Sequence, residues 1–271
     1  MSACSRTAIV LRTSVALAAA FGLMFSGCAT RRGLDGRLAD ENTMAALWFQ
    51  HAAECRALFY QACNVAHDVL TSEAPKHTNV AIVVDIDETV LDNSPYQARL
   101  IQRGEPFRTD TWHDWVQRFR AQALPGVVAL LNDATNRFAA NRLEVFYLSN
   151  RTEDQREATL LNLQHEGFPN ADSQHLKLRT NGSSKEARRQ EITNTHHIVL
   201  LMGDNLGDFA QDFDVIGAPR TAATDAAREE FGRRFIVLPN PMYGDWEKTF
   251  YESKATAKEK LRRRREAVDG Y

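Results

Sequence analysis

The segment VAIVVDIDET, residues 80–89, begins with five consecutive apolar residues and continues with aspartates at positions 85 and 87. A short, uniformly apolar run rich in β-branched residues is typical of a parallel strand that is buried on both faces of a sheet. Because alternate residues of an extended chain point the same way, we expect Asp85 and Asp87 to face one pocket. Two such carboxylates repel each other unless a cation or a proton lies between them. The segment therefore predicts a central strand that ends in a charged site.

Three further apolar runs of the same kind predict further strands at residues 145–148, 198–202 and 235–238. Helical patterns lie between them, and residues 152–155 form a capping box that predicts the start of a helix ended by Gly167. This alternation predicts an α/β fold with a parallel sheet between layers of helices. Ligands of such folds bind at the carboxyl ends of the strands.

Two segments stand outside this alternation. Apolar residues repeat with a helical period from about residue 40 to 71, which predicts one long amphipathic N-terminal helix. Residues 92–124 are rich in aromatic residues and proline and contain no clear strand. We interpret residues 92–124 as a small cap over the carboxyl edge of the sheet.

The composition excludes several classes of protein. The chain has 271 residues, of which 44% are apolar and 25% charged, so a disordered chain, a collagen or a coiled-coil rod is not expected. The formal net charge is −2, and it is −4 without residues 1–27, which hold Arg6 and Arg12 but no acid. This balance gives no electrostatic reason to expect a nucleic acid polymer as partner.

The N-terminus has the pattern of a secretory signal. Arg6 and Arg12 precede an uncharged apolar stretch at residues 15–25, and small residues then lead to Cys28. We expect residues 1–27 to be a signal peptide that is removed on export. The sequence Ser-Gly-Cys resembles the bacterial lipobox, in which the cysteine becomes a lipid anchor, so Cys28 is the candidate lipidation site; ordinary signal-peptidase cleavage near Gly27 is the alternative. Residues 28–39 are polar and are interpreted as a tether to a domain at 40–271.

Polar groups suited to phosphate chemistry follow the predicted strands. The run at 145–148 is followed by Ser149 and Asn150, whose hydroxyl and amide suit a phosphoryl oxygen. The run at 198–202 is followed by Asp204 and Asp208, and Lys185 lies at a predicted helix start, where its charge adds to free backbone N–H groups. Hard divalent cations prefer oxygen ligands, and Mg²⁺ is the usual choice near phosphate. An acidic loop alone is often only a solvated turn, but the four pieces together are a strong signal.

These four pieces, in this order, resemble the haloacid-dehalogenase (HAD) phosphatase superfamily. The closer resemblance is to the class C bacterial acid phosphatases, the lipoprotein e family, and it is carried by residues 85–96, 146–151, 203–209 and 239–244. It extends from about residue 40 to 250. It implies a Rossmann-like HAD fold and an exported, lipid-anchored phosphomonoesterase that uses Mg²⁺ and often acts on nucleoside 5′-monophosphates. Gly207 departs from the pattern, where many members are expected to carry a further acid.

The resemblance also suggests a role for each site residue. We expect Asp85 to attack phosphorus and form an aspartyl-phosphate, and Asp87 to act first as the acid and then as the base. Mg²⁺ would be held by Asp85, the backbone carbonyl of Asp87 and Asp204, with Asp208 orienting this shell. The equatorial phosphoryl oxygens would be bound by Ser149, Asn150 and Lys185.

Aromatic residues are the candidates for recognition of the leaving group. We expect Tyr96, Trp112 and Tyr243 to stack on a nucleobase, which favours a broad choice of bases. The alternative is that Trp112 and its neighbour Trp115 pack inside the cap.

Three questions stay open in the sequence. A different class of function is an uptake lipoprotein that binds haem or a nucleotide, although no pair of histidines has a convincing axial arrangement. A second enzyme activity is phosphotransfer, with an alcohol intercepting the aspartyl-phosphate. The apolar stripe of the long N-terminal helix also suggests a homodimer at the outer membrane or in the periplasm.

Overall fold

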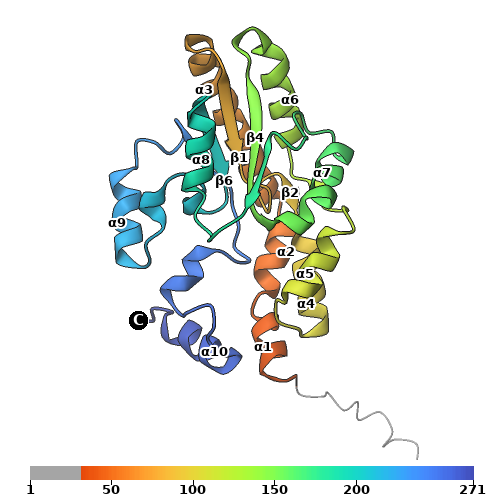
Figure 1. Cartoon of the computed structure of the whole chain (residues 1–271). Helices are drawn as coiled ribbons and strands as arrows, with labels where there is room; N and C mark the ends of the chain where they lie inside the picture. Colours follow the sequence, from red (N-terminus) through yellow and green to blue (C-terminus); the bar gives the residue numbers. More distant parts are fainter. Residues whose placement is uncertain (1–31) are drawn as a thin grey trace, which may run out of the picture. The chain divides into compact units, whose positions relative to one another are not determined.

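A five-stranded parallel sheet forms the centre of the fold, with the strand order β5-β4-β1-β6-β7 (Figure 1). The computed structural model describes residues 32–271, and Gly33–Tyr271 form one compact unit. The predicted signal peptide, Cys28 and the first residues of the predicted tether lie outside the described residues. The strands are β1 (Val80–Val84), β4 (Glu144–Thr152), β5 (Leu176–Arg179), β6 (His197–Gly203) and β7 (Phe235–Val237). The α/β fold predicted from the sequence is confirmed.

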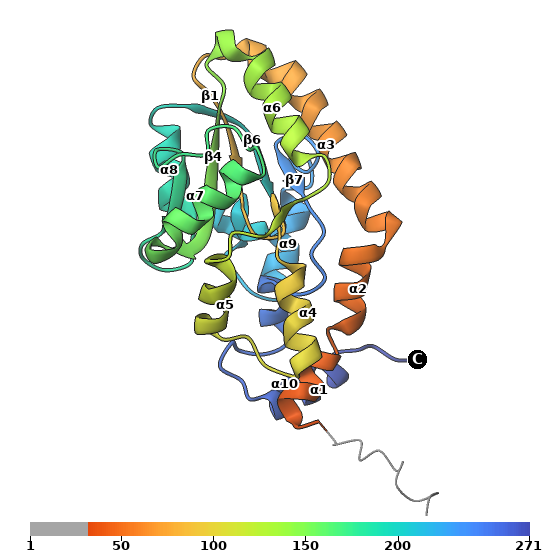
Figure 2. The same ribbon diagram turned by 90° about the vertical axis from the view of Figure 1, so that its right-hand side faces the viewer.

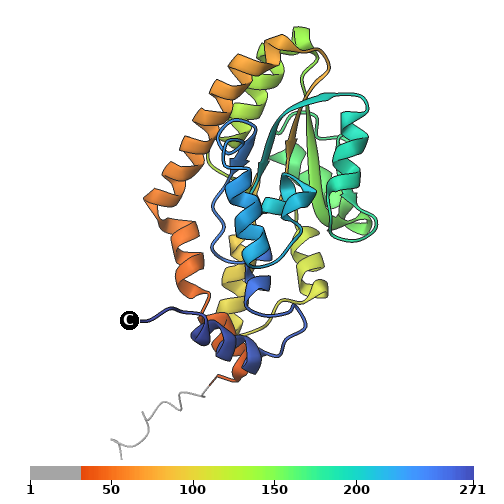
Figure 3. The ribbon, with the colours of Figure 1, turned by 90° about the vertical axis from the view of Figure 1, so that its left-hand side faces the viewer.

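Helices cover both faces of this sheet. Helices α3 (Ala53–Glu73) and α6 (Val127–Arg137) lie side by side on one face, and α8 (Glu186–Thr193) and α9 (Ala218–Ala226) cover the other (Figures 2 and 3). Helix α7 (Arg156–His165) packs beside β5, and it follows the predicted capping box at residues 152–155.

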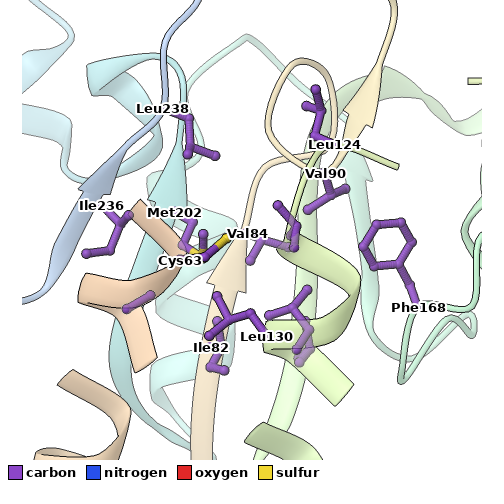
Figure 4. Close-up of a cluster of buried hydrophobic side chains, with 14 of the residues drawn as sticks. Cys63, Ile82, Val84, Val90, Leu124, Leu130, Phe168, Met202, Ile236 and Leu238 are labelled. Atoms are coloured by element: carbon purple, nitrogen blue, oxygen red, sulfur yellow. The ribbon is translucent and has the colours of Figure 1, made fainter. Parts of the chain in front are cut away.

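The continuous apolar runs are explained by this double covering. Ile82 and Val84 of β1 point toward α3 and α6, where Cys63 and Leu130 meet them (Figure 4). Val83, the residue between them, belongs to the core on the opposite face of the sheet. All five residues of β1 are buried, so neither face leaves room for a polar side chain.

The N-terminal part contains three helices instead of the single long helix predicted over residues 40–71. They are α1 (Leu34–Asp40), α2 (Thr43–His51) and α3. The break between α2 and α3 is at Ala52, whose ψ of 127° is extended. Helix α2 packs against α4 (Ser94–Arg103) of the cap, whereas α3 packs against α6 and the sheet. The two helices on either side of Ala52 therefore contact different parts of the fold. Residues 34–39, expected to be part of a tether, are helical because α1 packs on α10 (Ala257–Glu266).

The insertion after β1 is helical, as predicted for a cap. It contains α4 (Ser94–Arg103) and α5 (Thr109–Val116). A short antiparallel pair, β2 (Leu91–Asp92) and β3 (Gln122–Ala123), closes its base, although no strand was expected there. Short 3₁₀ segments complete the described elements, at Ala74–Lys76, Ala139–Asn141, Glu153–Gln155, Leu206–Asp208, Gln211–Phe213 and Asp245–Thr249. Within residues 32–271, no helix is both long and apolar enough to cross a membrane.

Candidate active site

Three carboxylates converge at the carboxyl ends of β1 and β6. Asp85 directly follows β1, whereas Asp204 and Asp208 follow β6, and one oxygen of each lies within 4.8 Å of the others. These strands are neighbours in the sheet, and the Asp85 N–H donates to the carbonyl oxygen of Met202 at 2.9 Å. The topology therefore brings together acids that are more than a hundred residues apart, as the sequence predicted.

This carboxylate group is electrostatically unfavourable in the absence of a counter-charge. Burial raises the pKa of Asp85 to about 7, although the nearby Lys185 opposes the shift. Burial, together with the charges of Asp208 and Asp85, raises the pKa of Asp204 well above its usual range. Each shift shows that the site resists holding three negative charges.

Lys185 is the cation closest to this group. Its ammonium contacts the Asp85 carboxylate and lies 2.7 Å from Asp208 Oδ1. Burial alone would lower the pKa of Lys185, but the carboxylates of Asp208 and Asp85 outweigh it and the pKa is raised. Lys185 immediately precedes α8, at the helix start that the sequence predicted.

The donor set fits a hard divalent cation. All three converging side chains offer oxygen, the ligand atom that Mg²⁺ prefers. Asp204 is also oriented by Asn240, whose Nδ2 donates to its Oδ2 at 2.8 Å. The backbone N–H of Asn205 donates to Asp208 Oδ2 at 3.0 Å and fixes that carboxylate in turn. The structure thus places Asp85, Asp204 and Asp208 where the sequence analysis expected metal ligands, but it leaves the side chain of Asp87 outside this group.

Asp87 is instead held by a separate network. Arg151 Nη2 donates to Asp87 Oδ1 at 2.7 Å, and Arg151 Nε lies 3.1 Å from the same oxygen. Asn93 Nδ2 also donates to Oδ1, at 2.8 Å, and Ser149 Oγ donates to Oδ2 at 3.3 Å. Three side chains therefore fix the carboxylate of Asp87. It lies beside the three converging carboxylates of Asp85, Asp204 and Asp208, which we call the metal-ligand group.

Arg151 and Asn93 were not among the candidate site residues of the sequence analysis. Arg151 lies within the motif that gave Ser149 and Asn150, but nothing in the spacing shows that its side chain reaches Asp87 across 64 positions. Asn93 accepts a hydrogen bond from Trp115 Nε1 at 2.8 Å, which connects Asp87 to the cap.

Glu88 is a third residue that the sequence analysis did not single out. It is fully buried, has a φ of 59°, and accepts a hydrogen bond from the Asn93 N–H on Oε1 at 2.8 Å. Its Oε2 has no hydrogen-bond partner among the described residues. Burial, reinforced by the charges of Asp87 and Asp204, raises the pKa of Glu88 well above its usual range. The surroundings of Glu88 therefore favour its neutral, protonated form over the charged carboxylate.

A cavity of about 640 Å³ leads from these groups to the cap and to both ends of the described chain. Asp85, Asp87 and Lys185 line its inner end. Further out, its wall includes Asn150, Phe107, Trp112 and Tyr243, together with residues of α1 and α10.

Two of the predicted site residues, Tyr96 and Ser149, do not line this cavity. Tyr96 is 1% exposed and does not line the cavity. Its hydroxyl bonds Thr111 at 2.9 Å, and its ring packs edge-on against Trp112 with centroids 5.2 Å apart, so it supports the wall instead of presenting a surface to a ligand. Ser149 is completely buried behind Asp87, and its backbone partner is the Arg151 N–H at 3.0 Å.

Comparison with known proteins identifies the family. Residues 37–246 match the profile of the HAD superfamily, subfamily IIIB (acid phosphatase). The chain belongs to this family. The structure of the class C acid phosphatase from Bacillus anthracis superposes with a TM-score of 0.81 and 38% sequence identity, over 87% of this chain and 99% of that one. The tungstate-bound structure of the same enzyme gives 0.81 and 37%.

Plant proteins are more distant relatives. The stem 28 kDa glycoprotein of Glycine max is 27% identical over 201 residues, and acid phosphatase 1 of Solanum lycopersicum is 27% identical over 161 residues. The matched part spans 72% and 59% of this chain and 69% and 57% of those proteins. The chain is thus an acid phosphatase, and the alternative of a pure haem- or nucleotide-binding protein is not supported.

Proposed function

We propose that this acid phosphatase hydrolyses nucleoside 5′-monophosphates through an aspartyl-phosphate intermediate. The observation that carries the proposal is the placement of Asp85, a member of the metal-ligand group, at the inner end of a cavity that the fixed carboxyl of Asp87 also lines. Covalent catalysis by a carboxylate divides one difficult hydrolysis into two displacements.

In the first displacement, a carboxylate oxygen of Asp85 forms a bond to phosphorus while the bond to the leaving oxygen breaks. Asp87 donates a proton to that leaving oxygen. In the second displacement, a water oxygen attacks phosphorus, Asp87 accepts the proton of that water, and the bond to Asp85 breaks. The contacts of Asp87 with Arg151 and Asn93 support this role because they aim its carboxyl before substrate arrives.

The remaining polar groups would bind the phosphoryl oxygens. We assign this role to Lys185 and Asn150, which line the cavity, and to Ser149, which lies behind Asp87. Mg²⁺ would be held by Asp85, Asp204 and the backbone carbonyl of Asp87, with Asp208 orienting that shell, and when bound it would offset the negative charge of the phosphoryl group. The bound tungstate of the Bacillus anthracis enzyme is an oxyanion and agrees with an anion site in this family.

The outer part of the cavity supports recognition of a nucleoside. A volume of about 640 Å³ is within the range of cavities that hold ligands of nucleotide size. Trp112 and Tyr243 offer aromatic surface on its wall, and base–aromatic stacking tolerates any base. We therefore propose these two residues as the stacking surface.

We further propose that the enzyme is exported and anchored through Cys28, and that it forms homodimers. The anchor rests on the sequence pattern at residues 15–28. The dimer is supported by Met44 and Leu47 of α2, which are 74% and 44% exposed. Mass spectrometry of the mature N-terminus tests the anchor, and sedimentation of the purified enzyme tests the dimer.

Phosphate release from 5′-AMP and nicotinamide mononucleotide, with and without EDTA, tests the activity. We expect release that depends on Mg²⁺ and is abolished in Asp85→Asn. The matched control is Asp133→Asn, since the side chain of Asp133 is 55% exposed on α6. An Asp85→Asn enzyme with near wild-type turnover would refute the assignment of Asp85 as the nucleophile. Addition of alcohols tests the phosphotransfer alternative, because transfer to an alcohol would release less free phosphate than free nucleoside.

A further inference from the structure

Helices α1 and α10 come from opposite ends of the described chain and pack side by side (Figures 1 and 3). A groove of about 580 Å³ lies between them, outside the catalytic cavity. Most of the side chains that line it are basic: Arg37 from α1 and Lys258, Arg262 and Arg265 from α10. Leu34 and Glu266 also line this groove, which we call the basic groove.

The positive charge of the basic groove is largely uncompensated. Arg262 pairs with Glu266 at 2.6 Å. Among the residues that the structure describes, Arg37, Lys258 and Arg265 form no ion pair. The whole chain has a formal net charge of −2, so this excess reflects a local arrangement and not the average composition.

These basic side chains are not needed to hold α10 in place. Leu261, which also lines the groove and is only 6% exposed, and Arg264 perform that task. Arg264 lies 3.2 Å from Glu247 and donates to the Tyr251 hydroxyl at 2.9 Å. Lys258 and Arg265 are both exposed, so they are accessible to an external partner.

The position of the groove in the chain indicates what that partner is. Leu34, the first residue of α1, is only six positions after Cys28, and a fully extended segment of that length spans about 20 Å. The segment between them contains Arg31 and Arg32, which have the same sign as the groove and so do not compensate it. The lipid anchor proposed at Cys28 would therefore limit the length of chain between a membrane and Leu34 to about 20 Å.

We propose that the basic groove docks on the headgroups of anionic phospholipids in a bilayer. Clustered lysine and arginine side chains near a membrane attract anionic lipids, each contributing separately to the affinity. Leu34, which is 45% exposed beside these charges, would enter the interface as apolar side chains of interfacial helices do. The attraction does not require lipidated Cys28, so it can be measured on a chain without the anchor.

Vesicle flotation of a chain that begins at Ala29 tests this proposal, because Gly33–Tyr271 form a compact unit by themselves. At low ionic strength we expect at least tenfold stronger binding to vesicles containing phosphatidylglycerol than to vesicles of phosphatidylcholine alone. Added salt should abolish the difference. Phosphate release should be the same in all the variants below, since none of the altered residues lines the catalytic cavity.

The double variant Lys258→Gln/Arg265→Gln should weaken binding to the anionic vesicles by about tenfold or more. The matched control is Arg228→Gln/Arg233→Gln, which removes the same amount of charge from exposed positions. These two residues precede the amino end of β7, whereas the catalytic cavity lies at the carboxyl ends of the strands. Equal binding to both kinds of vesicle, or equal losses in the two double variants, would overturn the proposal. Vesicle binding with no phosphate release would instead refute the proposed function alone.

Discussion

Replacement of Arg151 by methionine is the sharpest test of how Asp87 is held. The Arg151 side chain is 2% exposed and that of Asp87 is 19% exposed, so water cannot readily take over the contact. Methionine keeps much of the apolar stem and removes the guanidinium. Asn93 Nδ2 and Ser149 Oγ would remain as donors to Asp87, at 2.8 and 3.3 Å. The carboxyl would then be free to turn about the two remaining contacts.

The size of the effect follows from the geometry. Two unit charges separated by 2.7 Å attract each other by about 6 kcal/mol at an effective dielectric constant of 20, before desolvation is subtracted. Breaking a buried pair by removing one partner costs about 3 to 5 kcal/mol of stability. General acid catalysis contributes about 10² to 10⁴ in rate, so a poorly aimed Asp87 should lower kcat by about 100-fold. KM should change little, because Arg151 does not line the cavity.

Steady-state phosphate release and denaturant unfolding measure the two effects separately. Arg156→Met is the matched control: Arg156 pairs with the exposed Glu153 and donates to the Leu176 carbonyl at 3.0 Å, and neither contact involves Asp87. Thr159→Val removes the outer contact of Arg151, in which Nη1 donates to Thr159 Oγ1 at 3.1 Å, together with the hydrogen bond from Thr159 Oγ1 to the Gln155 carbonyl, and should give a smaller loss of kcat. A folded Arg151→Met enzyme with kcat within twofold of the wild type would refute this account of Asp87.

Three further outcomes are expected. Gly203→Ala should lower activity more than tenfold and weaken Mg²⁺ binding in calorimetry, because a Cβ there would overlap the Asp208 side chain, whereas Gly207→Ala should be mild. In EDTA, the free energy of unfolding should fall as pH rises from about 4 to about 7, because burial raises the pKa of Asp85 to about 7 and the folded state therefore binds more protons than the unfolded state. A melting temperature that rises over this pH range would contradict this prediction. Added Mg²⁺ should restore most of the lost stability near pH 7. Glu88→Gln should make stability depend less on pH and should be more stable than the wild type above neutrality, because burial raises the pKa of the Glu88 carboxyl. Denaturant titrations at two pH values measure this. Equal losses of stability with pH in the two proteins would exclude the explanation.

The sequence predicted the sheet well where strands are buried on both faces. Strands β1, β4 and β6 contain continuous apolar runs that are buried on both faces, whereas the run of β7, an edge strand, includes Val237, which is 46% exposed. Strand β5 was not predicted because Leu176-Lys177-Leu178-Arg179 is an edge strand with alternating burial and has no such run. The break at Ala52 was also not predicted, since no proline or glycine marks it and it depends on the different packing partners of α2 and α3.

The candidate site could be predicted only where function determines residue type at a strand end. Asp85 and Asp204 follow that rule, and the parallel topology brings them together. The partners that orient Asp87 follow no local rule, because the contact of Arg151 with Asp87 depends on side-chain direction across two strands. Tyr96 shows the reverse error, since an aromatic residue in a cap can support the wall without reaching the ligand.

The outer wall of the catalytic cavity is built from both ends of the described chain. Leu38 and Ala39 of α1 line it together with Lys260 and Arg264 of α10. A chain in which α10 is detached from α1 would keep its sheet and its acidic centre but would have an open pocket, so the shape of the pocket depends on the contact between these two helices.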